Sequence, residues 1–538
     1  MFKLFLLLFI SASLSADITL QDIESKPASR MKNFMIWQFL KQDITPKEAD
    51  LAYSLVEGNS YKIYREYIKK TDNKDIKKRI SCQQEKNLLK IEDEECLNLA
   101  FSLYKTLPMT KEQREELALK IKEESKKNLL KIQSEPYTQE AYEKYDATTI
   151  LTNFISTTKK HRRENLNIYL DEAFINSLEG SWKISQFVDI VLHDENLDKL
   201  KQSLLKLRGD TLDSKTNFHL ALNHLLHQNK NEAISFFELS MKKAKHRIDV
   251  DKNYFWIYKV SKDSNYLNEL LKSSDINIYT LYAHEMQNKE VDNYFSAVET
   301  NDLVSQRDLK DPFEWSTILQ EIRESPQDKL YELSQEYMNQ EMIPVQTMIL
   351  ERAYSYKMHG FVMPYSNYLR DVENDDKALI YAIMRQESNF IPSALSRSYA
   401  LGLMQIMPFL TDDLSKRVKD PVGSYEDMFI PKNNINYALK HLAWMKKSLY
   451  HPLFMAYAYN GGMGFLRRHL EGGTFSNSEY EPYLSMELMA NNESREYGKK
   501  VLANYVMYKK VLGEDVSIIH LFDRLKHPSE TDRFREQG

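Results

Sequence analysis

Apolar residues recur along most of the chain at the three- and four-residue spacing of amphipathic helices. In residues 217–245, one apolar stripe is followed by the polar turn QNKNE and a second stripe; the apolar positions are Leu220, Leu222, Leu225, Leu226, Ala233, Ile234, Phe237 and Leu239. Residues 254–274 repeat this arrangement. Helix, short turn and helix in succession is typical of an α-solenoid, so we expect an α-superhelical domain with degenerate repeats over residues 16–300. Such a domain either holds a large partner or serves only as a scaffold, and the pattern leaves both open.

Two further segments follow. Residues 301–365 read as a short helical linker domain. Residues 366–538 differ because they hold most of the local glycine clustering, namely Gly461, Gly462, Gly464, Gly472 and Gly473. Glycine clusters mark places where the backbone turns sharply or approaches a ligand. We therefore expect a separate, mostly helical C-terminal domain that carries the chemistry.

Composition supports an all-α chain and narrows its chemistry. Only 14 Gly and 15 Pro occur in 538 residues, fewer than the turns of an all-β fold need. The net charge of −5 gives no argument for nucleic acid or an anionic membrane as a partner. The 13 His show no ligand spacing such as H-E-x-x-H, so we predict neither a metal nor another cofactor.

The first residues and the two cysteines indicate export. The stretch MFKLFLLLFISASLS has one Lys, an apolar run and then small residues, which is the pattern of a secretory signal peptide over residues 1–15. The apolar run is too short to span a bilayer, so we expect no transmembrane anchor after cleavage. The two cysteines, Cys82 and Cys96, are expected to form a disulfide in an exported protein.

A carboxylate ends an apolar helical stripe in AIMRQESNF. Glu387 lies seven residues after Ile380 and four after Ile383, so the three share one face of a helix. Burial disfavours the charged carboxylate and raises its pKa, and a protonated acid near neutral pH is what a departing glycosidic oxygen needs. A lone Glu at a helix end is more often an exposed residue without a task.

Three later segments add candidate groups. ALGLMQIMP (400–408) offers Gly402 for close backbone approach to a substrate and the Gln405 amide. AYAYNGG (456–462) places a Tyr hydroxyl before a glycine pair. In SMELMANNESREYGKKVL (485–502), Glu487 is expected to face a cleft, whereas Glu493 and Arg495 are expected to make surface or capping contacts. Each segment alone is also explained by ordinary helix packing.

Together and in this order, the four segments resemble the soluble lytic transglycosylases of the Slt70 type. RQESNFIPSALS is similar to the family's catalytic helix, GLMQIMP to its second motif, AYNGG to its A-Y-N-A-G motif, and ELMANNESREYGKKVL to its closing motif. The resemblance is strong over about 375–505 and architectural upstream. It implies a goose-lysozyme-like catalytic domain on a ring-shaped superhelical domain.

The resemblance also implies a reaction and a set of residues. The family cleaves the β-1,4 bond between N-acetylmuramic acid and N-acetylglucosamine in peptidoglycan and forms a 1,6-anhydromuramoyl product, as a lyase. Glu387 would be the sole catalytic acid and base. The positions that map onto the family's glycan cleft are Ser396, Gly402, Gln405, Met407, Tyr459 and Glu487, of which Tyr459 and Glu487 would lie closest to the chemistry. Arg385 and Gln386 would be supporting residues.

Three departures from the family pattern bear on the site. Tyr399 occupies a family glycine position, which predicts a differently shaped loop before GLMQ. Gly461 and Gly462 stand where Ala and Gly are usual. LMANNE lacks the usual Pro-Phe, which leaves the wall behind Glu487 unsettled. None of these changes touches Glu387.

The resulting hypothesis is a periplasmic enzyme that acts as a monomer on peptidoglycan glycan strands, with cell-wall or secretion machinery as possible partners. Two other functions stay open. One is a glycan-binding scaffold with an idle site, and the other is a hydrolase that uses water, as a lysozyme does.

Overall fold

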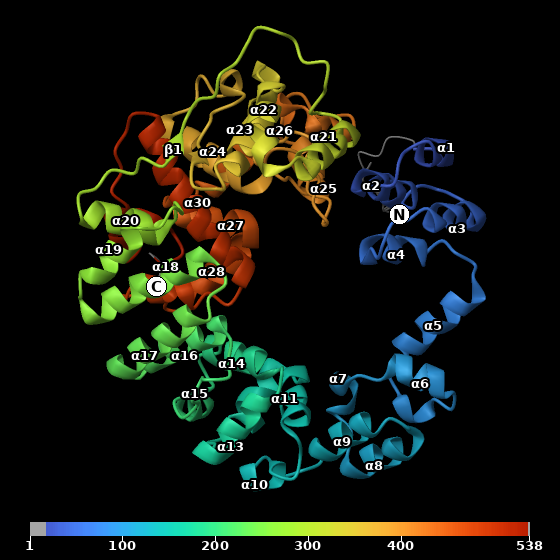
Figure 1. Ribbon diagram of the computed structural model, residues 1–538. Coiled ribbons are helices and arrows are strands. Elements are labelled where there is room, and N and C mark those ends of the chain that lie inside the picture. The colour runs from blue at the N-terminus through green and yellow to red at the C-terminus, as the bar shows by residue number, and fades with distance from the viewer. Residues whose placement is uncertain (1–17, 536–538) are drawn as a thin grey trace, which may run out of the picture.

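The computed structural model describes residues 18–535, so the predicted signal peptide, residues 1–15, lies outside the described residues. Helices account for nearly all of the regular structure, and they follow one another around a ring (Figure 1). The predicted all-α fold is therefore confirmed. No helix in the described part of the chain is long and apolar enough to cross a membrane.

The ring begins with four short helices, which we call the N-terminal arm (residues 18–68). They are α1 (Leu20–Glu24), α2 (Arg30–Phe39), α3 (Pro46–Ser54) and α4 (Tyr61–Tyr67). Side-chain caps start these helices: Thr19 and Thr45 each accept a hydrogen bond from the backbone three residues on, and an acidic residue at that position returns a bond to the cap. Such capping boxes satisfy backbone donors at the helix start and fix where each short helix begins.

The next arc has a small core of its own. Its helices are α5 (Lys74–Gln84), α6 (Glu94–Ala100), α7 (Leu103–Thr106), α8 (Lys111–Lys120), α9 (Glu124–Ile132) and α10 (Gln139–Tyr142). Leu88, Leu97, Leu117 and Leu130 pack together there, apart from the main core. The predicted disulfide is confirmed: Cys82 on α5 and Cys96 on α6 are bonded, with Cα atoms 5.0 Å apart. It ties two helices of this thin part of the ring.

The superhelix continues as packed helix pairs: α11 (Ala147–Ser156), α12 (Lys159–His161), α13 (Glu172–Ser177), α14 (Ile184–His193), α15 (Asp198–Leu204), α16 (Ser214–Leu226), α17 (Lys230–Lys242), α18 (Arg247–Ser261), α19 (Asn265–Leu271) and α20 (Ile278–Met286). Residues 227–229 separate α16 from α17, so the turn is shorter than the predicted QNKNE (228–232), whose last three residues begin α17. The two helices pack together, with the ring of Phe218 against that of Phe237. The second predicted pair is α18 and α19. The helical repeats thus follow the sequence pattern.

A second small core links the superhelix to the C-terminal segment. It contains α21 (Pro312–Glu324), α22 (Leu330–Gln335) and α23 (Ile343–Ala353), packed through Ile318, Leu330 and Val345. Strands β1 (Tyr294–Phe295) and β2 (His359–Gly360) pair in parallel, with Tyr294 opposite His359. This pairing joins the entry and the exit of the linker segment.

The C-terminal segment comprises α24 (Asn374–Ser388), α25 (Pro408–Ser415), α26 (Pro431–Met445), α27 (Pro452–Gly461), α28 (Met463–Glu471), α29 (Tyr483–Glu487), α30 (Asn492–Val511), α31 (Ile518–Arg524) and α32 (Pro528–Thr531). The long helix α30 packs against both α24 and α27. A Cβ at Gly498 would come within 2.1 Å of the Tyr457 ring, so only glycine allows α27 and α30 to approach this closely. This packing sets the position of α24, which carries Glu387.

Candidate active site

Glu387 lies in the last turn of α24, whose middle is buried. Ile380 and Ile383 are fully buried, and the helix ends at Asn389, which takes a left-handed φ of 48° and donates its N–H to the Arg385 carbonyl. The Ser388 hydroxyl donates to the Leu403 carbonyl at 2.8 Å, so the helix end is tied to the GLMQ loop. The apolar face places the Glu387 carboxyl at the edge of the core, as predicted.

The Glu387 carboxyl is partly buried and has one side-chain hydrogen bond. The Tyr497 hydroxyl on α30 donates to its Oε1 at 2.8 Å. Burial raises the pKa of Glu387 to about 7, against the lowering effect of the Tyr497 bond, and the charge of Glu493 adds to the rise. The carboxyl is therefore close to half protonated at neutral pH, which suits a group that must give a proton and take one.

Tyr459 on α27 lies beside this carboxyl. Burial raises its pKa well above the usual range, and the charge of Glu387 adds to the shift. The Tyr459 hydroxyl donates to the Met404 carbonyl at 2.7 Å. The structure thus places Tyr459 near Glu387, as expected. However, the Tyr459 hydroxyl donates its hydrogen bond to the backbone of the GLMQ loop and not to the carboxyl.

The GLMQ loop is locked by its own polar contacts. Gln405 donates from Nε2 to the carbonyls of Ala394 and Gly402, at 2.9 and 2.8 Å. A Cβ on Gly402 would lie 2.3 Å from Asn434 Nδ2, and its φ is 73°. Gly402 therefore permits close approach to α26, whereas the sequence led us to expect close approach to a substrate.

Three expected glycan contacts lie along this loop and are partly exposed: Ser396, Gln405 and Met407. The Ser396 hydroxyl accepts hydrogen bonds from the backbone N–H groups of Ser398 and Ala400, at 3.2 and 2.9 Å. These bonds shape the loop before GLMQ and leave the hydroxyl proton of Ser396 available to a ligand.

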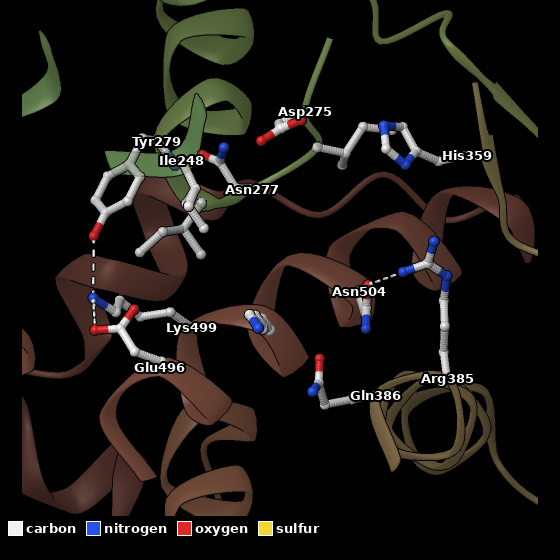
Figure 2. Close-up of a pocket in the computed structure, with 13 residues that line it drawn as sticks. Ile248, Asp275, Asn277, Tyr279, His359, Arg385, Gln386, Glu496, Lys499 and Asn504 are labelled. Atoms are coloured by element: carbon white, nitrogen blue, oxygen red, sulfur yellow. Dashed lines mark hydrogen bonds and ion pairs between the residues drawn. The ribbon is translucent and has the colours of Figure 1, made fainter. Parts of the chain in front are cut away.

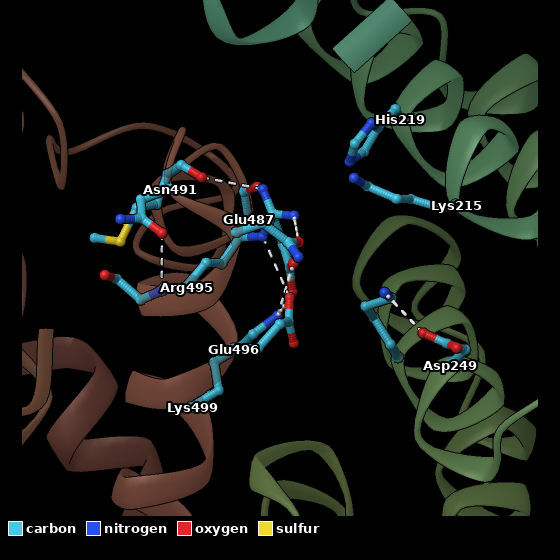
Figure 3. Close-up of polar contacts among 12 residues, drawn as sticks. Lys215, His219, Asp249, Glu487, Asn491, Arg495, Glu496 and Lys499 are labelled. Carbon is cyan, nitrogen blue, oxygen red and sulfur yellow. Dashed lines mark hydrogen bonds and ion pairs between the residues drawn. The ribbon is translucent and has the colours of Figure 1, made fainter. Parts of the chain in front are cut away.

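Glu487 is placed differently from its expected position in the cleft. It is 4% exposed, and both of its carboxylate oxygens are used: Tyr279 of α20 donates to Oε1 at 2.6 Å and Lys499 donates to Oε2 at 3.0 Å. Although burial opposes it, the charges of Glu487 and Glu496 raise the pKa of Lys499. Figure 3 shows Glu487, Glu496 and Lys499 on the C-terminal segment, across from Lys215, His219 and Asp249 of the superhelix. Glu487 thus holds the seam between α20 and α30.

Arg495 is buried, so of its two expected roles, surface or capping contacts, the structure shows the capping one at the end of α29. It is 3% exposed and donates from Nη1 to the carbonyls of Glu487 and Met489, at 3.3 and 3.0 Å. The same nitrogen lies 3.0 Å from Nε2 of His193 on α14. The residue therefore joins the closing motif to the superhelix.

Arg385 holds the end of α24 through contacts with the linker segment and α30. It donates from Nη2 to Glu351 of α23 at 2.8 Å, from Nε to the Gly360 carbonyl at 3.0 Å, and from Nη1 to Asn504 of α30 at 3.2 Å. Figure 2 shows Arg385 and Gln386 lining a cavity of about 260 Å³ between α24, α30 and the superhelix. The linker segment thus fixes the end of α24.

One group of potential metal ligands exists among the described residues, at the same seam: Asp189, His193 and His219. Lys215 lies 3.2 Å from Asp189 Oδ1, and the His193 ring is held between the Asp189 carbonyl and Arg495. Burial lowers the pKa of both histidines. The neighbouring cations and the occupied His193 nitrogens disfavour a metal ion here.

Two residues that act on Glu387, Tyr497 and Glu493, were not predicted from the sequence. Both belong to the closing motif NESREYGKKVL, four residues apart on one face of α30. That shared face was the available signal. The preceding Asn460, part of AYNGG, donates to Glu493 at 3.4 Å and accepts from Ser494 at 2.7 Å, so the two motifs meet beside the acid.

The fold and the site define a class: a helical ring that presents one partly buried carboxyl group at the end of a core helix. Residues 364–480 match the family model of the transglycosylase SLT domain, which includes Glu387 and the GLMQ and AYNGG segments. The predicted resemblance to soluble lytic transglycosylases of the Slt70 type is confirmed by this match and by the relatives below.

Two characterised relatives match the chain in part. The membrane-bound lytic murein transglycosylase C of Mannheimia succiniciproducens is 36% identical over 118 residues, which cover 20% of this chain and 31% of that protein. The soluble lytic murein transglycosylase of Salmonella typhimurium is 27% identical over 213 residues, which cover 38% of this chain and 32% of that protein. The chain thus spans about a third of the length of these relatives.

Solved structures match over nearly the whole length. The lytic transglycosylase Slt of Pseudomonas aeruginosa, solved as an inactive mutant, has a TM-score of 0.50 at 14% identity and covers 93% of this chain and 89% of that one. The 70 kDa Slt70 of Escherichia coli has a TM-score of 0.48 at 16% identity and covers 96% and 85%. The first of these matches supports the ring-shaped fold.

Proposed function

We propose that this protein is an exported peptidoglycan lytic transglycosylase. The observation that carries the proposal is the Glu387 carboxyl, which lies in the segment that matches the SLT domain, has a pKa of about 7, and accepts a hydrogen bond from Tyr497 beyond that segment. The two relatives that match the chain in part are named as lytic murein transglycosylases. The division into residues 16–300, 301–365 and 366–538 and a periplasmic location belong to the same proposal.

In the proposed reaction, Glu387 acts twice. Oε1 is held by Tyr497, so Oε2 carries the proton that passes to the glycosidic oxygen as the bond to C1 breaks. The resulting carboxylate then takes the proton of the C6 hydroxyl of the same muramoyl residue, and O6 bonds to C1. The product is a 1,6-anhydro sugar, the carboxyl is protonated again, and no water is consumed. Most glycosidases instead need a second carboxyl group.

The geometry assigns supporting roles to the other predicted residues. Ser396, Gln405 and Met407 remain the proposed glycan contacts because they are partly exposed on the loop beside α24. Tyr459 positions the GLMQ loop by donating a hydrogen bond to the Met404 carbonyl. We assign Gly402 and Glu487 to packing and to the domain seam rather than to glycan binding.

Mass spectrometry of digested cell-wall sacculi tests the proposal. The expected products are muropeptides that end in 1,6-anhydromuramic acid. Reducing-end products would instead show a hydrolase that uses water, and intact glycan would show a binding scaffold. Glu387→Gln should release no product while it still sediments with sacculi, because the amide keeps the shape but cannot exchange a proton. Glu115→Gln, an exposed residue of α8, is the matched control and should digest normally.

A further inference from the structure

The N-terminal arm touches the loop that precedes GLMQ, far from it in sequence. The ring of Tyr399 is 2% exposed, and its centroid lies 5.1 Å from that of Phe34 and 5.4 Å from that of Trp37, both on α2. The ammonium of Lys62 on α4 lies 5.5 Å from the centre of the same ring. Tyr399 is thus enclosed by the first helices of the chain, which lie beside the C-terminal segment (Figure 1).

Polar contacts continue on both sides of this ring. Arg30 donates from Nη1 to the Leu395 carbonyl at 2.7 Å, and Lys62 donates to the Ser398 carbonyl at 2.5 Å. The two cations therefore hold the backbone of the loop at two carbonyls, four residues and one residue before Tyr399. We call the contact of residues 395–399 with α2 and α4 the clasp.

Tyr399 has a backbone conformation that is unusual for a residue with a side chain. Its φ is 62°, in the left-handed region that glycine enters freely and that bulky residues rarely adopt. A non-glycine residue held there costs on the order of 1–3 kcal/mol unless its surroundings compensate. The loop therefore has a backbone conformation that glycine would adopt without strain. At Tyr399, the aromatic contacts of the clasp offset the strain of the positive φ.

The loop held by the clasp also carries the proposed glycan contacts. Ser396 accepts from the Ala400 N–H at 2.9 Å, and the Gly402 N–H donates to the Ala394 carbonyl at 2.8 Å. Gln405 donates to the same Ala394 carbonyl at 2.9 Å. A displacement at Tyr399 is thus passed to Ser396 and Gln405, whereas the Glu387 carboxyl has its own hydrogen bond to Tyr497 of α30.

We propose that Tyr399 is a positioning residue through which the N-terminal arm sets the glycan-contacting loop. The N-terminal arm then meets the C-terminal segment at the loop that carries the proposed glycan contacts. The arm therefore contributes to substrate affinity as well as to the ring structure. This proposal rests on the proposed function. Its consequence is a separation of effects: weakening the clasp should change KM, while kcat and its pH dependence, which report Glu387, should stay close to their original values.

Tyr399→Gly is the main test, because it removes the ring and relieves the left-handed strain, so the chain should still fold. We expect KM for soluble glycan chains to rise by about tenfold, the equivalent of one lost aromatic contact of about 1.4 kcal/mol, with kcat changed by less than about twofold. Trp37→Ala, which removes one of the two α2 rings that contact Tyr399, should raise KM similarly. Tyr399→Phe keeps the ring and should restore the original KM.

The double variant Tyr399→Gly with Trp37→Ala distinguishes a shared contact from two separate defects. Its KM should be no higher than that of either single variant. Amide hydrogen exchange of residues 394–406, which needs no activity, should accelerate in both single variants while α30 stays protected. Unchanged KM and unchanged exchange in Tyr399→Gly, or fully additive effects in the double variant, would overturn the clasp. A wild-type protein without anhydro products would overturn the function instead, whatever the exchange shows.

Discussion

Replacing the Glu387 carboxyl by the amide of Gln should stabilise the protein at neutral and higher pH. Burial raises the pKa of Glu387 from 4.5 to about 7 in the folded protein. Between these values the folded protein binds a proton at this site more tightly than the unfolded chain does. The free energy of unfolding therefore falls as pH rises through this window, and an amide, which does not titrate, avoids the loss.

The magnitude follows from the shift. Each pKa unit is worth about 1.4 kcal/mol, so the change from 4.5 to about 7 corresponds to roughly 3 kcal/mol. The difference in unfolding free energy between Glu387→Gln and the wild type should be constant below about pH 4 and should move in favour of the variant by up to about 3 kcal/mol by about pH 8. Denaturant unfolding of the full chain at several pH values measures this difference.

Glu115→Gln, at an exposed glutamate of α8, serves as the matched control. If the Glu387→Gln difference varies with pH no more than the Glu115→Gln difference does, the Glu387 carboxyl titrates as an ordinary glutamate. It would then be almost fully ionised at neutral pH, and its role as the proton donor would be refuted together with the burial argument.

Two further predictions concern packing and the seam, and both are measured by thermal unfolding. Gly402→Ala should lower the free energy of unfolding by about 2 kcal/mol more than Gly473→Ala does. Both residues have a positive φ, but only at Gly402 would the new Cβ collide, 2.3 Å from Asn434 Nδ2. Equal losses would contradict the close contact. Lys499→Met should lower the free energy of unfolding by about 3–5 kcal/mol, because it leaves the buried Glu487 without its cation. Adding Glu487→Gln should restore much of the lost stability. No recovery in the double variant would argue against the ion pair.

The helical repeats could be predicted because their signal is local. The apolar stripes of α16 and α17 and the turn between them are set by residues a few positions apart. The closure of the ring had no such signal. Arg30 and Leu395 are separated by 365 residues, and nothing in either neighbourhood identifies the other as a partner. Sequence periodicity thus gives the elements of the ring but not the contact that closes it.

The site divides in the same way. Glu387 was predicted from its own helix, since the apolar stripe of α24 fixes which face it occupies. Glu487 was misplaced, because its partner Tyr279 belongs to α20, 208 residues earlier. Tyr497 was missed because its contact with Glu387 depends on how α30 crosses α24. The motif gave the residue types, and helix packing decides which of them face the acid.

The pKa of Glu387 results from opposing effects: burial and the charge of Glu493 raise it, whereas the Tyr497 hydrogen bond lowers it. A single group that works as both acid and base, as proposed for Glu387, needs both directions of shift. Burial alone would keep the carboxyl protonated, which favours donation to the glycosidic oxygen and hinders removal of the C6 proton. The Tyr497 hydrogen bond favours the carboxylate and moves the pKa back toward neutrality. Because the optimal catalytic pKa lies near the working pH, Tyr497 contributes to the proposed chemistry by limiting the rise that burial and Glu493 impose on the pKa.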